Sequence, residues 1–169
     1  RRFLSPRRCP FEMHDFTLCH WPAFIALGES WIAARDAGDV VDLVLAPWVS
    51  ALPTLDLWLH VEIGEMHHVR DLIPTLDWDG GRLGVRLRYE PKDLSLLYKD
   101  FMGAVSDAEA LKAAAIAAAN EHPDAYPPPG PPKLTIWPES LVDFLSKRLS
   151  THFTIRAYSL DPAKLAAPD

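Results

Sequence analysis

The sequence predicts an α+β fold in which an antiparallel sheet of three to five strands packs with four or five helices. Segments 55–63 and 82–89 alternate apolar and polar residues, as strands do when one face lies in a core. The turn signal Asp79-Gly80-Gly81 precedes the second segment and indicates a hairpin, which implies antiparallel pairing. Helical patterns do not alternate evenly with the three best strands, so a doubly wound parallel sheet is not expected.

Length and composition fit one globular domain with short appendages. The chain has 169 residues, of which 49% are apolar and 24% are charged, enough for a sizeable core. Its longest apolar stretches are interrupted well short of the ~18 residues that a membrane-spanning helix needs. The net charge of −6 argues against general nucleic-acid binding, which requires a basic surface. We therefore expect a soluble protein with no membrane span and no nucleic-acid partner.

The first residues are strongly basic. No acidic residue precedes Glu12, and four arginines lie within the first eight positions: Arg1, Arg2, Arg7 and Arg8. An Arg-rich, acid-free start is typical of what remains of an organellar targeting segment. An arbitrary boundary, or a reading frame opened upstream of Met13, is the alternative. We expect an intracellular protein, cytoplasmic or organellar, with the mitochondrial matrix as the organellar candidate.

The first predicted helix begins near Pro22, because proline suits the first helical turn. Its core stripe recurs at helical spacing: Phe24, Leu27, Trp31 and Ala34. Gly38 is the expected stop. Asp39 is then expected to cap a second short helix, which Pro47 limits or kinks.

Two strands form the predicted centre of the fold. In 55–63 the inward positions are Leu55, Leu57, Leu59, Val61 and Ile63. Residues 65–72 are ambiguous between a strand and a single helical turn. A hairpin of roughly 72–78 with 82–90 is expected. Its second arm turns Leu83, Val85, Leu87 and Tyr89 one way and Arg82, Arg86 and Arg88 the other.

The last part of the chain predicts helices separated by a proline-rich segment. A helical pattern starts at Asp93, and a capping box at Ser106 predicts a separate alanine-rich helix to about Asn120. After the prolines, 134–137 resembles a short strand. Pro138 opens a helix with a predicted buried face of Leu141, Phe144, Leu145 and Leu149. Residues 152–160 alternate again and predict a last strand.

These elements suggest a main body with a smaller unit attached through a connector. We expect the smaller unit to pack on the body, since it is too short for a core of its own. The predicted organisation is a basic arm at 1–12, an α+β body at 13–122, a Pro-rich connector at 123–132, a helix–strand unit at 133–160 and a tail at 161–169.

A run of histidines and glutamates after the first predicted strand is a candidate metal site. On a strand, His60 and Glu62 point to the same side, roughly 7 Å apart. In a helical turn, Glu65 and His68 meet at i, i+3. Such side chains suit a divalent metal, but their spacing matches no motif with a known mechanism. The alternative is a solvated strand face followed by a polar loop.

A second candidate site lies on the polar face of the second strand. Arg82, Arg86 and Arg88 share that face, and Trp58 joins them if the two strands lie in one sheet with matching pleat. Tryptophan and arginine are enriched at protein interfaces. The alternative is an exposed face whose arginines pair with nearby acids at little net energy. If the face is an interface, reversing the charges of Arg86 and Arg88 should abolish association without unfolding the chain.

Three functions follow from these patterns. The preferred one is a non-catalytic protein-interaction or accessory module, without a cofactor, that binds another protein or itself within a complex. The alternative is a small metal-dependent enzyme or metal-binding domain using His60, Glu62, Glu65 and His68. A small-molecule carrier with a pocket between sheet and helices is the third. No nucleophile elbow or phosphate-binding loop is found in the sequence, so catalytic residues stay unassigned.

Overall fold

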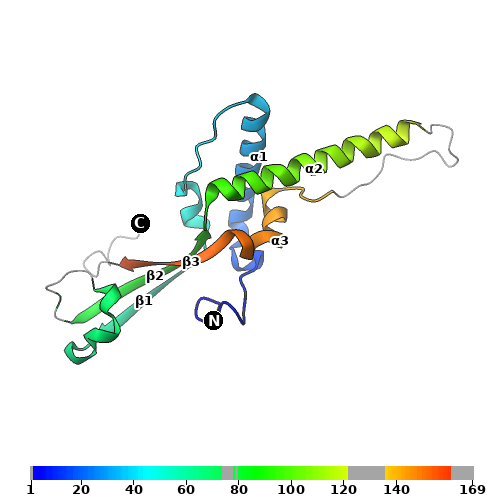
Figure 1. Ribbon diagram of the computed structural model, residues 1–169. Coiled ribbons are helices and arrows are strands. Elements are labelled where there is room, and N and C mark those ends of the chain that lie inside the picture. Colours follow the sequence, from blue (N-terminus) through cyan, green and yellow to red (C-terminus); the bar gives the residue numbers. More distant parts are fainter. Residues whose placement is uncertain (1, 74–77, 79, 122–135, 161–169) are drawn as a thin grey trace. The chain divides into compact units, whose positions relative to one another are not determined.

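The computed structural model describes residues 2–73, 78, 80–121 and 136–160 (Figure 1). Three α-helices lie in this part of the chain: α1 (Trp21–Ala37), α2 (Leu94–Glu121) and α3 (Leu141–His152). The strands are β1 (Thr54–Val61), β2 (Gly81–Pro91) and β3 (Phe153–Leu160). Short 3-10 helices connect them: η1 (Met13–Asp15), η2 (Leu18–His20), η3 (Ala46–Ala51), η4 (Ile63–His68) and η5 (Arg70–Leu72). None of the described helices is long and apolar enough to cross a membrane.

The chain folds into two compact units. The sheet unit comprises Arg1–Pro10, Leu52–Glu90 and Phe153–Asp169, and the helical unit comprises Phe11–Ala51 and Pro91–His152. The three strands belong to the first unit, except for Pro91 at the end of β2, and all three α-helices belong to the second. The mixed class and the antiparallel sheet are therefore confirmed, and the sheet has three strands in the part that the structure describes.

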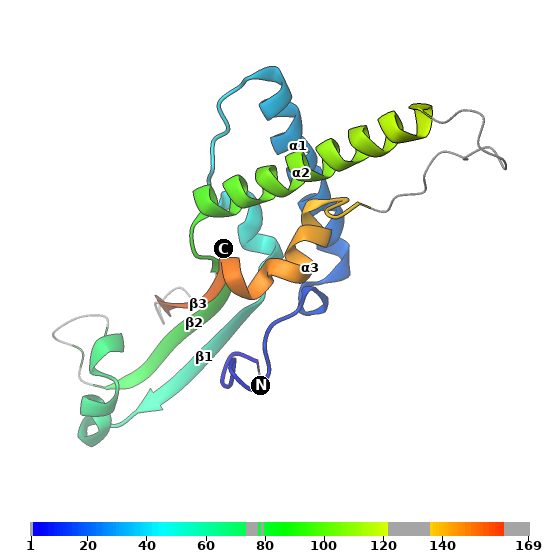
Figure 2. The ribbon, with the colours of Figure 1, turned by 45° about the vertical axis from the view of Figure 1, so that its right-hand side comes forward.

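β2 is the central strand of the sheet, with β1 and β3 on its two sides (Figure 2). β1 and β2 run antiparallel, and their register places Leu57 opposite Val85. The expected hairpin of 72–78 with 82–90 differs from this arrangement, because Leu72 lies in η5 and β2 pairs with β1. Residues 74–77 and 79 lie outside the described residues. The turn signal predicted that β2 pairs with the segment just before it. The strand that pairs with β2 is instead β1, the earlier segment with the long alternating pattern.

One face of the sheet carries the apolar side chains of β2. Leu83, Val85 and Tyr89 are buried, and the Tyr89 ring lies 5.5 Å from that of Phe153 at the start of β3. Three of the four residues of the predicted inward face of β2 are thus buried, and the fourth, Leu87, is half-buried. The inward face predicted for 55–63 is only partly correct, because Leu59 is 39% exposed and Ile63, beyond the end of β1, is 74% exposed. β1 is an edge strand, so fewer elements cover its apolar side chains.

α1 begins and ends as the sequence predicts, with Pro22 in its first turn and Gly38 after its last. The helix expected at Asp39 is absent from the structure: Val40 is 98% exposed, and the next helical segment is η3. Trp48 in η3 is 1% exposed, with its ring 5.2 Å from that of Phe24. A short isolated helix at 39–45 would be only marginally stable. Burial of the large Trp48 side chain in η3 contributes more, so the chain adopts the conformation that buries Trp48.

α2 is a single helix, so the predicted break at Ser106 is wrong. Asp93 caps its beginning by accepting hydrogen bonds from the backbone N–H groups of Ser95 and Leu96, at 2.8 and 3.0 Å. Residues of high helix propensity lie on both sides of Ser106, so the helix continues through it. Among the residues of α2 up to position 118, the buried apolar side chains lie in its first part: Leu97, Phe101, Met102 and Val105.

α3 buries the face that the sequence predicts. Leu141, Phe144, Leu145 and Leu149 are all buried, although the helix begins at Leu141 rather than at Pro138. β3 follows at once and confirms the last predicted strand. The short strand expected at 134–137 is not seen at positions 136 and 137, and 134–135 lie outside the described residues.

α1 and α3 approach each other closely at a glycine. A Cβ atom added to Gly28 in α1 would lie 2.7 Å from the Cβ of Leu141, whereas one added to Gly103 in α2 would have no atom within 4 Å. Both glycines lie within helices, where alanine is the better helix former. They differ in that only Gly28 has a neighbouring side chain close enough to exclude a methyl group.

We expect Gly28→Ala to lower the free energy of unfolding by about 1–3 kcal/mol, because the added methyl group overpacks the α1–α3 contact. Gly103→Ala should raise it by about 0.5–1 kcal/mol, because alanine favours the helix and meets no neighbour. Urea denaturation followed by tryptophan fluorescence measures both changes. Equal effects of the two substitutions would show that α1 and α3 do not approach as described.

Candidate functional site

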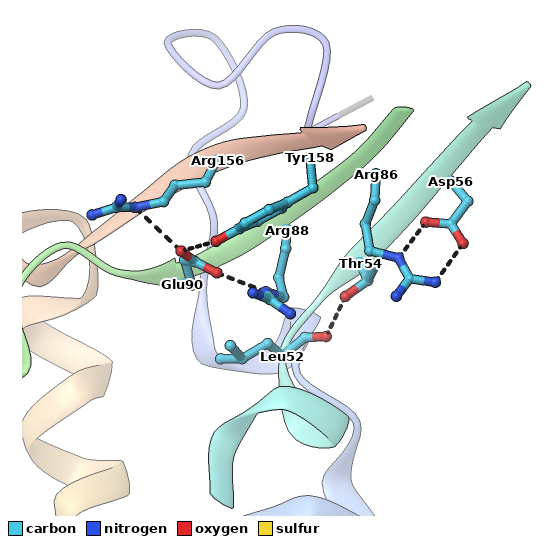
Figure 3. Close-up of polar contacts among 8 residues, drawn as sticks. All are labelled: Leu52, Thr54, Asp56, Arg86, Arg88, Glu90, Arg156 and Tyr158. Atoms are coloured by element: carbon cyan, nitrogen blue, oxygen red, sulfur yellow. Dashed lines mark hydrogen bonds and ion pairs between the residues drawn. The ribbon is translucent and has the colours of Figure 1, made fainter. Parts of the chain in front are cut away.

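Polar side chains from all three strands gather on one face of the sheet. The β1–β2 register places Asp56 opposite Arg86, Trp58 opposite Gly84 and His60 opposite Arg82. Arg156 and Tyr158 of β3 reach the same face through Glu90 (Figure 3). We call this surface the arginine face and define it by nine residues: Asp56, Trp58, His60, Arg82, Arg86, Arg88, Glu90, Arg156 and Tyr158.

Glu90 lies at the centre of the polar contacts between β2 and β3, with only 3% of its surface exposed. Its Oε2 accepts a hydrogen bond from Arg88 Nε at 2.6 Å. Its Oε1 accepts one from the Tyr158 hydroxyl at 2.6 Å and lies 3.2 Å from Arg156 Nε. A buried carboxylate is stable only when it is paired and hydrogen-bonded, and three side chains fulfil that condition here.

Arg88 is fixed from two directions. Its guanidinium bonds to Glu90, and its Cζ lies 4.6 Å from the centre of the Tyr158 ring, in a cation–π contact. Partial burial lowers the pKa of Arg88, but the hydrogen bond to Glu90 and the nearby Tyr158 outweigh it and leave the pKa above its ordinary value. Arg88 is thus a structural cation with 13% of its side chain exposed.

Arg86 and Asp56 form a forked pair across β1 and β2. Arg86 Nε and an Nη donate to the two carboxylate oxygens of Asp56 at 2.8 and 2.9 Å. The hydrogen bond from Arg86 lowers the pKa of Asp56. The side chains are 25% and 35% exposed, so solvent screens the pair and its contribution to stability is about 0–1 kcal/mol.

The Trp58 ring lies against Gly84 of the central strand. A Cβ added to Gly84 would overlap the Trp58 ring and would lie 2.7 Å from the Cβ of Leu160. The glycine therefore makes room for the indole, and the indole covers backbone that has no side chain of its own. This packing fixes the orientation of the half-buried ring on the arginine face.

The structure brings Trp58, Arg82, Arg86 and Arg88 onto one face, as their alternation suggests. Arg82 is exposed and makes no ion pair with another residue of the described chain. The face also includes Glu90, Arg156 and Tyr158, which the sequence did not predict as members. Glu90 shares the parity of the three arginines of β2, and Arg156 and Tyr158 alternate together in β3, but no local pattern shows that they meet.

The histidine and glutamate run adopts a different arrangement. His60 is exposed on β1, while Glu62 and Glu65 cap η4 reciprocally through their side chains and backbone N–H groups. The ring of His68 packs against that of His67, with centroids 3.8 Å apart. No three histidine, cysteine, aspartate or glutamate side chains within the described ranges are grouped so that they could hold a metal ion. The metal site stays a prediction.

A buried histidine of the helical unit lies beside a cavity. His152 is 3% exposed and lines a cavity of about 630 Å³ between α2 and α3. Its Nε2 lies 3.6 Å from Asp100 Oδ2, too far for a hydrogen bond. Burial lowers the pKa of His152. Asp100 opposes this change, and Lys92 and Arg148 add to it.

Comparison of the chain with protein-family models, with curated proteins and with solved structures finds no match in any of the three. Its function is therefore inferred from the described residues alone.

We expect Glu90→Gln to lower the free energy of unfolding by about 3 kcal/mol, because it leaves the guanidinium of Arg88 largely buried without a carboxylate. Asp56→Asn removes a carboxylate from the more exposed pair and should cost about 0–1 kcal/mol. Chemical denaturation gives both values. If Asp56→Asn proved as costly as Glu90→Gln, Glu90 would not be the centre of the face.

We expect the stability of the chain to fall as the pH drops below about 6.5, the pKa of an unfolded histidine. The lowered pKa of His152 means that the folded state binds its proton less readily than the unfolded state. The stabilisation that comes from the neutral, buried His152 is therefore fully present above pH ~6.5. It is lost as the pH falls through the pKa of His152 in the folded state. Urea denaturation at several pH values should show a smaller acid-induced loss for His152→Gln than for the native chain. Identical pH dependence in both would exclude this role of His152.

Proposed function

We propose that the chain is a non-catalytic protein-interaction module, an accessory part of a complex that binds its partner through the arginine face. The buried Glu90 carboxylate is the observation that carries the proposal. It holds two arginines and a tyrosine in fixed positions on a sheet surface.

The charge of the arginine face supports the proposal. The face contains four arginines and two carboxylates, a net charge of +2 on a chain whose net charge is −6. The rest of the chain therefore carries −8. A local cationic surface on an acidic protein steers binding and orients a partner more than it adds affinity.

The residue types and their rigidity point in the same direction. Tryptophan, tyrosine and arginine are the side chains that most often dominate the energy of protein interfaces. Trp58 is held over Gly84, and Tyr158 is held by Glu90 with 37% of its surface exposed. Side chains that are ordered before binding lose less conformational entropy when the partner arrives.

Arg88 is a poor position for a charge-reversal test. A glutamate there would lie beside the buried Glu90, and one at Arg86 would face Asp56. Loss of association after such changes would not be separable from loss of the fold. Arg82 and Arg156 suit the test better, because Arg82 is exposed and the side chain of Arg156 is 53% exposed.

We expect the double variant Arg82→Glu/Arg156→Gln to reduce the fraction of chain in complexes at least tenfold. Complexes isolated from the source cells under mild conditions are to be weighed by native mass spectrometry. The control is Arg70→Glu/Arg7→Gln, which changes the net charge equally at exposed positions of the same unit outside the arginine face. Retention of the complex by the face variant, or its equal loss in the control, would overturn the proposal.

A further inference from the structure

The cations of the arginine face are not equivalent. Arg86 is matched by Asp56 in a forked pair, so the middle of the face is close to neutral. Glu90 serves both Arg88 and Arg156, so these three residues together keep one positive charge. Arg82, near the other end of β2, carries the second positive charge of the face. Within the face, positive charge is therefore concentrated at its two ends.

The separation of these ends follows from strand geometry. Arg82 and Glu90 are eight residues apart on β2, which corresponds to about 26 Å at ~3.3 Å per residue. Eight is an even number, so both side chains point to the same face. Between them lie the Trp58 ring and the tyrosine that binds Glu90.

We propose, on the basis of the proposed function, that the arginine face binds an extended acidic segment of a partner protein. The carboxylates of this segment lie eight residues apart and meet Arg82 at one end and Arg156 at the other. An extended chain has the same rise per residue as β2, so its eight-residue spacing matches that of the two positive ends. Uncharged residues of the segment cover Trp58 and Tyr158.

The charge pattern favours such a segment over a nucleic acid. A single strand carries a phosphate at every nucleotide and would place negative charges over Asp56 in the middle of the face. The −8 of the remaining chain would repel the same strand. A peptide with carboxylates only at its ends avoids the first penalty, and because it carries fewer negative charges it is repelled less by the remaining chain. Attraction at the exposed ends is screened within about 8 Å at physiological salt, so binding should be salt-sensitive.

The test uses the full chain and three labelled probes in fluorescence-polarisation titrations. The first is a peptide with a pair of glutamates at each end, centred eight residues apart on a serine–threonine spacer. The second has the same composition with all four glutamates adjacent. The third is a nine-nucleotide oligothymidylate.

The spaced peptide should bind at least fivefold more tightly than the clustered one and more tightly than the oligonucleotide. Its affinity should fall at least fivefold in Arg82→Glu/Arg156→Gln and should not change in Arg70→Glu/Arg7→Gln. Raising the salt from 50 to 300 mM should weaken it. Equal binding of the two peptides, no binding of either, or tighter binding of the oligonucleotide would overturn the inference.

The two proposals fail in different ways. If the native complex dissociates in the face variant and the spaced peptide does not bind, the acidic-segment inference is wrong and the proposed function stands. If the native complex is unaffected by the face variant, the proposed function itself is wrong.

Discussion

A carboxylate with 3% of its surface exposed imposes a strict condition on the chain around it. Glu90 has exchanged water for protein donors, and the penalty for removing a charge from water amounts to several kcal/mol unless those donors are well placed. They come from Arg88 on its own strand and from Arg156 and Tyr158 on β3. The same contacts that satisfy Glu90 therefore fix the side chains at one end of the arginine face and couple two strands through their side chains.

Strand periodicity accounts for what the sequence could predict of this site. Alternation in 55–63 and 82–89 determines which residues share a face once the strands pair, and it correctly groups Trp58 with the arginines of β2. The connection between Glu90 and Tyr158 spans 68 residues and leaves no local signature. Its prediction needs the position of β3 beside β2, which depends on tertiary packing rather than on the period of either strand.

The errors in the predicted elements have a common physical origin. Local signals at Asp39 and Ser106 describe what a short peptide would prefer. In the folded chain, the burial of Trp48 and the continuous helix propensity around Ser106 decide the outcome. Gly80 and Gly81, whose φ angles are positive, lie where β2 begins, but the partner of β2 is the earlier strand β1. The alternation of apolar and polar residues identified both strands, whereas local capping and turn signals gave wrong helix starts and a wrong strand partner.

The interleaving of the two units has a consequence for biosynthesis. The chain passes between the sheet unit and the helical unit after Pro10, Ala51, Glu90 and His152, so neither unit is a continuous segment. At about 5–20 residues per second, roughly 3–14 s separate the synthesis of Glu90 from that of its last donor, Tyr158. During that interval β1 and β2 can pair while the other edge of β2 stays open, as a template for strands of other chains. The nascent sheet unit is therefore most vulnerable to aggregation while the helical unit is being completed.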